Sequence, residues 1–307
     1  MKVILTGATG FVGVNLKSYL EEEGVIVEPT SLRIDDWKDK INSQADVIIH
    51  LAGKAHDTRN TSDDAEYFKI NRDLAVAVFE QFSTSDIKDF FYFSSVKAVA
   101  DSVVDILTED MMPMPLTPYG KSKLEAEEYL LSKRLPTGKR VFIIRPCMIH
   151  GPGNKGNLNL LYNVVKKGIP WPLASFENRR SFIGIDNLCY LIDKMMVSKD
   201  MESGIYQFAD DESLSTNDVV SITSKALGKK PKLWRFPVVL VKSAVKVGDS
   251  LSLPLNTERL KKLTESYVVS NQKIKNALGI NKLPFSAKEG LERTIQSFAR
   301  ESTSAKK

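Results

Sequence analysis

Cysteine and histidine are scarce in this sequence. The chain of 307 residues has 2 cysteines and 3 histidines. Cys147 and Cys189 are too few for a disulfide framework in a chain of this length. His50, His56 and His150 have no carboxylate or cysteine at a spacing typical of metal ligands. We therefore expect neither a disulfide-stabilised fold nor a metal site.

Long apolar runs and a strong charge of one sign are also missing. The nearest approach to a long apolar run, residues 237–241, is followed by Lys242 and Lys246, whereas a membrane-spanning helix needs about 20 apolar residues. The net charge is +5, and the basic residues are spread out apart from the pairs 229–230 and 261–262. Neither pair forms a nucleic-acid stripe, so both are interpreted as solvated faces with a mild preference for anionic ligands. With no signal peptide visible, we expect a cytoplasmic protein without membrane or nucleic-acid partners.

What the sequence does have is a regular alternation of strands and helices over its first half. Segments with helical periodicity separate short β-branched and aromatic runs at 1–6, 25–28, 45–53, 90–95 and 141–146. This alternation predicts an α/β fold with a Rossmann-type doubly wound parallel sheet over residues 1–150.

After residue 150 the sequence pattern changes, with more loops and prolines than in the first half. It predicts a smaller, mostly helical substrate-binding domain over 151–300 and a disordered tail over 301–307. Its expected helices lie at 158–167, 187–197, 216–227, 238–250 and 286–298. Segments near 181–185 and 205–208 have the pattern of strands that rejoin the main sheet.

A glycine-rich loop lies between the first strand and the first helix. Gly7, Gly10 and Gly13 follow the strand at once, and helical periodicity begins at Val14. Gly7 would allow a tight turn, Gly10 the close approach of a pyrophosphate, and Gly13 tight helix packing. The helix N-terminus would supply free N–H groups and positive dipole to the phosphates. The alternative is a glycine turn without a ligand, which this strand–loop–helix context disfavours.

The end of the second strand bears on the choice of cofactor. A domain that binds NAD usually has an acidic residue there to hold the ribose 2′-hydroxyl. Glu28 is the one candidate acid, and it lies early, whereas Ser31 and Arg33 follow the strand and would accept a 2′-phosphate. We therefore favour NADP(H) slightly over NAD, with Arg33 as an ordinary loop cation the equal alternative.

A tyrosine and a lysine four residues apart lie at the start of a predicted helix. Pro118 suits the first helical position, and the spacing places Tyr119 and Lys123 on one face. A nearby ammonium lowers the pKa of a phenol, which otherwise stays near 10, toward useful acid–base chemistry. Ser94 and Ser95 end a buried strand, where ligands bind in open α/β sheets. Surface residues and helix caps are the plain alternatives for these two pairs.

Several motifs agree in order and spacing, at residues 6–13, 50–53, 70–72, 93–95, 119–123 and 145–146. Together they resemble the extended short-chain dehydrogenase/reductase family, and more narrowly its NAD(P)-dependent epimerase/dehydratase group, which modifies nucleotide sugars. Residues 178–187 and 266–279 resemble the substrate-domain segments of the same proteins, so the resemblance covers most of the chain.

The resemblance implies a role for each matching residue. Tyr119 would be the acid–base group, Lys123 would lower its pKa and hold the nicotinamide ribose, and Ser95 would hydrogen-bond the reacting oxygen. The implied substrate contacts are Ser95, Asn157, Leu158, Arg179 and Arg180, of which Arg180 is preferred for the diphosphate. The implied cofactor contacts are Gly7, Gly10, Phe11, Val12, Gly13, Ser31, Arg33, Leu51, Ala52, Gly53, Asn71 (in a supporting role), Ser94, Tyr119, Lys123 and Pro146. Members of the family commonly dimerise, so a homodimer is expected.

Departures from the family pattern narrow the reaction. Sugar 4,6-dehydratases carry an acidic pair after the active-site serine or threonine, where this chain has Val96 and Lys97, so dehydration ranks low. We favour a 4-ketoreductase acting on a UDP- or dTDP-linked hexose in surface-polysaccharide synthesis, because the segment 33–45 is short. The alternatives are a nucleotide-sugar 4-epimerase and, in a different class, a non-catalytic NAD(P)-binding regulator.

Overall fold

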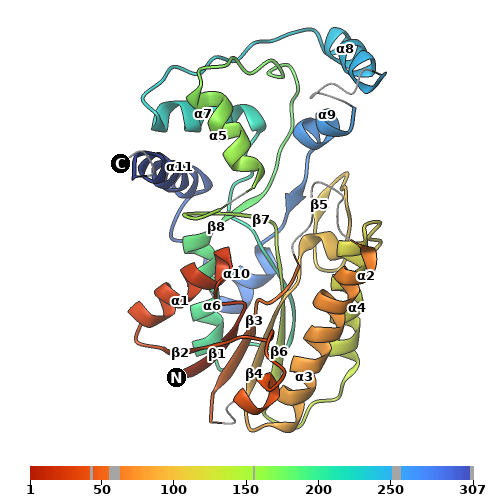
Figure 1. Ribbon diagram of the computed structural model, residues 1–307, viewed down its shortest axis with the longest axis vertical. Helices are drawn as coiled ribbons and strands as arrows, with labels where there is room; N and C mark the ends of the chain where they lie inside the picture. The colour runs from red at the N-terminus through yellow and green to blue at the C-terminus, as the bar shows by residue number, and fades with distance from the viewer. Residues whose placement is uncertain (42–43, 55–62, 155, 251–256, 305–307) are drawn as a thin grey trace.

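The computed structural model describes residues 1–41, 44–54, 63–154, 156–250 and 257–304 (Figure 1). At its centre is a six-stranded sheet in the order β2-β1-β3-β4-β6-β9, and every neighbouring pair is parallel. The strands are β1 (Lys2–Thr6), β2 (Ile26–Thr30), β3 (Val47–His50), β4 (Asp89–Phe93), β6 (Arg140–Pro146) and β9 (Gly204–Phe208). The predicted parallel sheet is confirmed. Its strands read as continuous apolar runs because both faces are covered.

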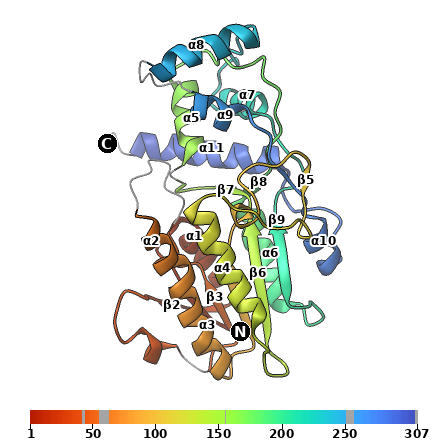
Figure 2. The same cartoon turned by 90° about the vertical axis from the view of Figure 1, so that its right-hand side faces the viewer.

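Helices cover the two faces of this sheet (Figures 1 and 2). On one face α1 (Phe11–Glu22) and α6 (Ile185–Val197) pack over the odd-numbered side chains of β1, such as Val3 and Leu5. On the other face α3 (Leu74–Thr84) and α4 (Pro118–Ser132) pack over Ile4, Ile48 and Phe90. The period-two alternation of strand side chains thus feeds two separate cores.

The helical segment between β3 and β4 is interrupted. It consists of α2 (Asp64–Tyr67), a π-helical turn (Phe68–Asp73) and α3. Asp63 caps its start, since the Asp63 carboxylate accepts a hydrogen bond from the backbone N–H of Ala65. A single π-helical turn inside a helix often marks a functional position, and here the turn contains Asn71.

A second group of helices lies above the carboxyl ends of the strands in both views (Figures 1 and 2). It comprises α5 (Asn157–Lys166), α7 (Thr216–Ala226), α8 (Val238–Ser250), α9 (Thr257–Thr264) and α11 (Ala287–Ser304). Two small cores hold it together, one around Leu158, Tyr162 and Phe298 and one around Trp171 and Val245. Short elements complete the fold: η1 (Trp37–Lys40), η3 (Val96–Ala98), β5 (Ile106–Leu107), β7 (Met148–His150), β8 (Phe182–Gly184), β10 (Val268–Val269) and α10 (Gln272–Leu278).

The chain does not divide simply at residue 150. Of the two later segments expected to rejoin the sheet, Gly204–Phe208 does so as β9, next to β6. The expectation for 181–185 is wrong, because Phe182–Gly184 pairs with β7 in a separate two-stranded sheet. Helices α6 and α10 also contribute to the core around β1, through residues such as Leu188 and Ile274. Helix α11 runs to Ser304, into the segment 301–307 that was expected to be a disordered tail; residues 305–307 lie outside the described chain.

No helix in the described ranges is both long and apolar enough to cross a membrane.

Candidate active site

The turn after β1 is fixed by backbone atoms that leave no room for a side chain at Gly7. Gly7 has a φ of +70°, and a Cβ there would lie 2.6 Å from the backbone N of Ala52. The Thr6 hydroxyl accepts a hydrogen bond from that same N–H at 3.3 Å, and the N–H of Leu51 donates to the Thr6 carbonyl. The glycine loop and the segment after β3 are therefore held together at the carboxyl edge of the sheet.

The other two glycines of the loop differ in what surrounds them. A Cβ on Gly13 would lie 2.3 Å from the Gly7 carbonyl oxygen, so helix α1 can approach the loop only with glycine there. A Cβ on Gly10 would meet a single atom within contact distance, the same oxygen, at 3.3 Å. Protein packing explains Gly13 but not Gly10, which leaves open the approach to the first turn of α1. That arrangement fits the pyrophosphate of a dinucleotide at a helix N-terminus. Phe11 and Val12, the first residues of α1, pack half-buried against the core behind it.

The end of β2 differs from the expectation. The strand continues to Thr30, so Glu28 lies in mid-strand, where its carboxylate pairs with the Lys2 ammonium at 2.7 Å. Glu28 is thus not the residue at the strand end that would hold a ribose hydroxyl. Ser31 and Arg33 follow the strand and are both exposed.

Tyr119 and Ser95 meet because two short helices begin side by side. Ser95 caps η3, accepting a hydrogen bond from the N–H of Lys97 at 3.2 Å, and Thr117 caps α4 through the N–H of Gly120. A Cβ on Gly120 would lie 2.4 Å from the Lys97 carbonyl oxygen. This contact brings the start of α4 against η3, and the Ser95 hydroxyl hydrogen-bonds Tyr119. Gly120 was not predicted as a site residue; its place between Tyr119 and Lys123 is the signal in the sequence.

The protonation of Tyr119 departs from the prediction. Burial raises the pKa of Tyr119 above its usual value, the hydrogen bond from Ser95 opposes this, and the neighbouring Tyr67 raises it further. The rings of Tyr67 and Tyr119 lie edge to face with centroids 6.1 Å apart. The expected lowering by Lys123 does not contribute to this pKa, and desolvation of the phenolate decides its direction.

Lys123 is buried, and this burial disfavours the charged form of its side chain. Its ammonium donates to the Phe93 carbonyl at 2.7 Å and lies 4.9 Å from the centre of the Tyr92 ring. Burial lowers the pKa of Lys123 to about 8, while Glu127 acts to raise it. A Cβ on Gly53 would lie 3.2 Å from the ammonium nitrogen, so glycine there keeps access to it open.

Asn71, in the π-helical turn, ties the end of β3 to α4. Its side-chain oxygen accepts from the N–H of Lys54 at 2.8 Å, and its amide donates to the Lys54 carbonyl at 3.1 Å and to the Ser122 hydroxyl at 3.2 Å. Its own carbonyl accepts from the Tyr92 hydroxyl. Asn71 is fully buried, so it stabilises the positions of Gly53 and Lys123 from behind.

A buried ion pair between Glu127 and Arg145 lies near Lys123. The sequence did not predict this pair. Glu127 and Arg145 are almost fully buried, and the Arg145 guanidinium grips the Glu127 carboxylate, with its Nε 3.0 and 3.1 Å from the two oxygens. The Ser94 hydroxyl also donates to Glu127, so that hydroxyl is turned into the protein. Glu127 is one helical turn beyond Lys123, on the same face, and that spacing was the available signal. Pro146, also buried, ends β6 beside this pair.

The two candidate diphosphate arginines lie in the upper part of the molecule and differ in exposure. Arg180 is half-buried, its Nε donates to the Glu265 carbonyl at 2.9 Å, and burial lowers its pKa. Arg180 is also close enough to lower the pKa of Lys97, whose lowering is caused first by burial and is opposed by Asp101. Lys97 follows Ser95 by two residues, so the charge of Arg180 acts on the segment that carries Ser95.

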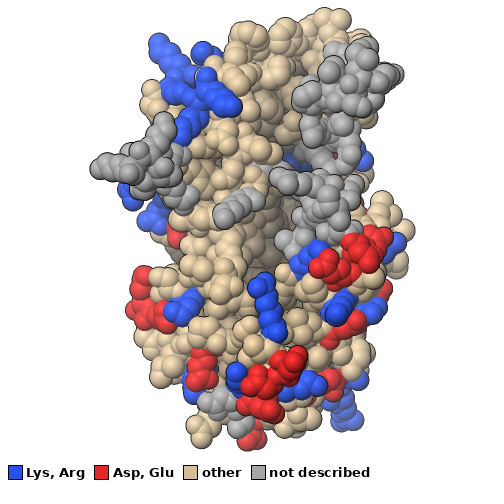
Figure 3. Space-filling view, viewed as in Figure 1, with Lys and Arg blue, Asp and Glu red and all other residues tan. Residues whose placement is uncertain are grey.

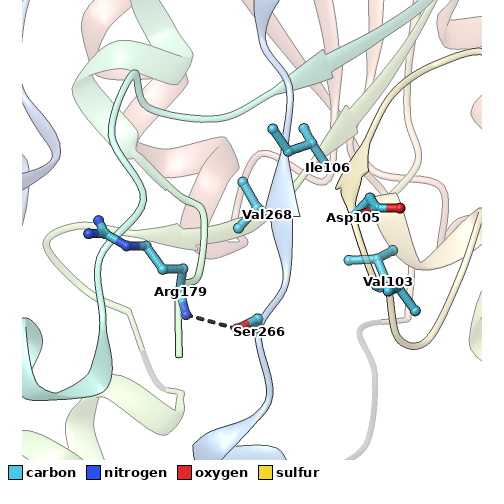
Figure 4. Close-up of a pocket in the computed structure, with 7 residues that line it drawn as sticks. Val103, Asp105, Ile106, Arg179, Ser266 and Val268 are labelled. Atoms are coloured by element: carbon cyan, nitrogen blue, oxygen red, sulfur yellow. Dashed lines mark hydrogen bonds between the residues drawn. The ribbon is translucent and has the colours of Figure 1, made fainter. Parts of the chain in front are cut away.

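Arg179 lines a cavity of about 550 Å³ with Val103, Asp105, Ile106, Ser266 and Val268. The backbone N–H of Arg179 donates to the Ser266 hydroxyl, and the guanidinium donates to the Ser213 carbonyl at 3.3 Å. Figure 4 shows this guanidinium directed away from Asp105 on the opposite wall. Arg179 is exposed, so it is less well placed than Arg180 to face the serine.

The remaining substrate candidates belong to the first turn of α5. Asn157 begins the helix, and its side chain lies outside what the structure describes. Leu158 is 5 % exposed and packs in the core with Tyr162 and Phe182. The side chain of Leu158 thus serves the core, and its place along a nucleotide stays a prediction.

Among the described residues, no group of three or more His, Cys, Asp or Glu side chains is arranged to hold a metal ion. His50 is fully buried, its Nδ1 lies 2.9 Å from the Thr6 hydroxyl, and burial lowers its pKa to about 3. His50 is thus a neutral structural residue. Cys147 and Cys189 are free thiols and buried.

Comparison with known proteins agrees with this geometry. The model of the NAD dependent epimerase/dehydratase family matches residues 3–208. The chain belongs to this family. It is 30% identical to UDP-glucose 4-epimerase of Vibrio cholerae, over 96% of the chain and 95% of that protein. It is 26% identical to N-acetyl-alpha-D-glucosaminyl-diphospho-ditrans,octacis-undecaprenol 4-epimerase of Escherichia coli O157:H7, over 96% of the chain and 94% of that protein.

Reductases are also among the family relatives. UDP-2-acetamido-2,6-beta-L-arabino-hexul-4-ose reductase of Pseudomonas aeruginosa is 30% identical over 65% of the chain and 50% of that protein. The fold resembles RMD from Pseudomonas aeruginosa complexed with NADPH, with a TM-score of 0.74 and 21% identity over 96% of this chain and 98% of that one. It also resembles MoeE5 in complex with UDP-glucose and NAD, with a TM-score of 0.74 and 20% identity over 98% of this chain and 100% of that one. The predicted family is thus confirmed, and the protein is an enzyme of the sugar-nucleotide epimerase and reductase type.

Proposed function

We propose that this enzyme is a sugar 4-epimerase that oxidises and re-reduces C4 of a hexose joined to a diphosphate carrier. The observation that carries the proposal is the hydrogen bond between Ser95 and Tyr119, one helical turn before the buried ammonium of Lys123, together with a glycine loop that fits a dinucleotide. Two relatives that match 96% of the chain bear 4-epimerase names. This reverses the preference for a reductase drawn from the sequence.

The residues divide the work as follows. A bound NAD(P) supplies the group that accepts and returns hydride. In its phenolate form Tyr119 would take the proton of the C4 hydroxyl during oxidation, and the phenol so formed would return that proton during reduction, since its hydroxyl is the titratable group beside Ser95. Ser95 orients that oxygen and stabilises charge on it. Lys123 keeps a positive charge behind the phenol, and its pKa of about 8 leaves it mostly protonated near neutral pH.

A 4-ketoreductase is the second candidate, and the end of β2 favours it. Glu28 is occupied with Lys2, whereas Ser31 and Arg33 stand exposed after the strand and suit a 2′-phosphate. A preference for NADPH would fit an enzyme that releases its cofactor after each turnover. We propose two classes of substrate for either reaction. One is a UDP- or dTDP-linked hexose, and the other is a sugar on a lipid diphosphate. A homodimer and a cytoplasmic location remain expectations.

One experiment separates these functions. The protein, purified without added cofactor, is extracted and its dinucleotide identified by mass spectrometry. It is then given UDP-glucose and UDP-N-acetylglucosamine while the C4 epimers are followed by NMR. Retained NAD and interconversion without added reductant support the epimerase. An empty site and consumption of NADPH with a 4-keto sugar support the reductase. Tyr119→Phe should reduce either turnover by about 10²- to 10⁴-fold while cofactor still binds; unchanged turnover would refute Tyr119 as the acid–base group.

A further inference from the structure

The segment between α7 and α9 is unusual in charge. From residue 219 to residue 248 the sequence contains no Asp or Glu. The described cations in this stretch that are exposed and lie beyond α7 are Lys229, Lys230, Lys232, Arg235 and Lys242. None of these five forms an ion pair with another described residue; Lys229 and Lys232 donate to backbone carbonyls of Lys166 and Gly168. Their charges are therefore available to an outside partner.

Two aromatic side chains stand among these cations on a backbone that is held in place. The N–H of Trp171 donates to the Lys232 carbonyl and the N–H of Trp234 donates to the Trp171 carbonyl, both at 2.8 Å. This pairing turns Leu233 inward, against the core that contains Trp171. Trp234 and Phe236 remain 53% and 43% exposed, with ring centroids 6.0 Å apart. A fixed backbone thus presents two large apolar side chains to the outside.

Helix α8 continues this apolar surface. Val241 and Val245, one turn apart, face the core, and Val245 is 2% exposed. Val239 and Leu240 lie on another side of the helix and are 74% and 62% exposed. A helix that is apolar on both its inner and outer sides normally has both covered. Within the described part of the chain, only the inner side of α8 is covered.

The position of this surface at one extreme of the molecule makes it accessible. Figures 1 and 2 place α8 at the end of the long axis farthest from the sheet in both views. In Figure 3, drawn in the view of Figure 1, a group of Lys and Arg side chains without acidic neighbours lies at the upper left of this end, whereas α8 lies at its upper right; the lower part of the molecule carries both signs interspersed. Exposed apolar side chains that alternate along the chain with charge of one sign, as Trp234 and Phe236 do with Lys232 and Arg235, are not an ordinary solvated surface.

We propose that this α8 surface docks on a bilayer that contains anionic phospholipid. We define it as Trp234, Phe236, Val239 and Leu240 with the cations Lys229, Lys230, Lys232, Arg235 and Lys242. The four apolar side chains would enter the boundary between headgroups and acyl chains, and the cations would meet the phosphates. A protein partner is less well matched, since the cores of protein interfaces are depleted of lysine. The absence of a spanning segment led us to expect no membrane partner, but a surface contact needs no such segment.

The test is sedimentation of the full chain with two kinds of vesicle. One is phosphatidylcholine alone, and the other is phosphatidylcholine mixed with phosphatidylglycerol. We expect binding to the mixed vesicles, weakened by added salt. The double variant Trp234→Ala with Phe236→Ala should weaken binding by about tenfold, through the loss of buried apolar area. Lys229→Glu with Lys230→Glu should weaken it by at least about fivefold per charge.

Matched controls keep the result specific. Val14→Ala with Leu131→Ala removes exposed apolar side chains from the sheet-side helices, and Lys38→Glu with Lys40→Glu reverses an exposed basic pair there. Both controls should bind vesicles like the parent, and circular dichroism should show all variants folded. Equal binding to the two vesicles, or unchanged binding by the aromatic variant, would overturn the proposal. Self-association that is lost in the aromatic variant, without any vesicle binding, would overturn it too and assign the surface to a second copy of the chain.

Discussion

The proposed cofactor side and the proposed substrate side of the site differ in how tightly their residues are held. Around the glycine loop, a Cβ on Gly7 or Gly13 would lie within 3 Å of backbone atoms, and Lys123 is locked to a main-chain carbonyl. On the substrate side, Arg179 and Arg180 are held mainly by bonds to carbonyls of neighbouring segments and stay exposed or half-buried. The difference indicates which contacts need a fixed geometry. Hydride transfer needs the reacting atoms at a set separation, whereas a diphosphate can be bound by cations whose side chains adjust.

The largest expected effect comes from breaking the rigid side. Gly13→Val places a side chain against the Gly7 carbonyl, so we expect a fall in melting temperature, about 1–3 kcal/mol or more of stability lost, and no measurable cofactor binding. Gly10→Ala is the matched control, because a Cβ there meets only one atom, at 3.3 Å. It should melt like the parent.

Cofactor titration then distinguishes packing from binding at the loop. If the pyrophosphate lies against Gly10, the Gly10→Ala variant should bind dinucleotide about 30- to 100-fold more weakly although it is folded. Binding at parental strength would show that the phosphates do not approach Gly10. The glycine loop would then be rigid for packing reasons alone, and not for binding the cofactor.

An intermediate effect is expected at the charge pair beneath Lys123. Glu127 acts to raise the pKa of Lys123, which burial lowers to about 8. In Glu127→Gln that support is lost, so the pKa of Lys123 falls. Turnover that needs the ammonium is lost as pH rises through this pKa, and the alkaline limb of the kcat profile should therefore move about one unit toward acid.

Two further variants separate electrostatics from structure in that prediction. Glu127→Asp keeps the charge and should restore the limb, while Ser94→Ala removes one hydrogen bond to Glu127 without changing charge and should leave the limb in place. The alkaline limb of the kcat profile could instead stay in place in Glu127→Gln while only the melting temperature falls. That result would mean that Glu127 stabilises the fold and does not influence Lys123 during turnover.

What the sequence predicted correctly is what short spacings determine. Strand–glycine–helix order predicted the loop, and the four-residue spacing of Tyr119 and Lys123 put them on one helix face, because both depend on neighbours within a turn. The features that were missed depend on partners far along the chain. Gly120 is explained by the carbonyl of Lys97, and the burial of Glu127 by Arg145 on β6.

The pKa of Tyr119 was mispredicted for the same reason. Spacing alone places a cation near the phenol, but the extent of burial decides the direction of the shift, and burial is a property of the whole fold. Likewise nothing local in 181–185 shows that this strand pairs with β7 rather than with the main sheet. Long-range contacts are the part of the structure that one sequence does not reveal.

The smallest expected effect lies on the adaptable side and would sharpen the comparison. Arg180→Ala should raise KM for the sugar substrate by about tenfold with little change in kcat, since it removes a charge-assisted contact made equally in ground and transition states. Arg179→Ala should change KM by less than about twofold, because its guanidinium is turned toward the Ser213 carbonyl. Arg180→Lys keeps the positive charge but lacks the two parallel N–H donors of the guanidinium. A KM between those of the parent and of Arg180→Ala would indicate bidentate contact with the diphosphate. The reverse order, with Arg179→Ala the more damaging, would mean that the arginine side chains exchange roles when substrate binds, and that this side adapts more than its structure suggests.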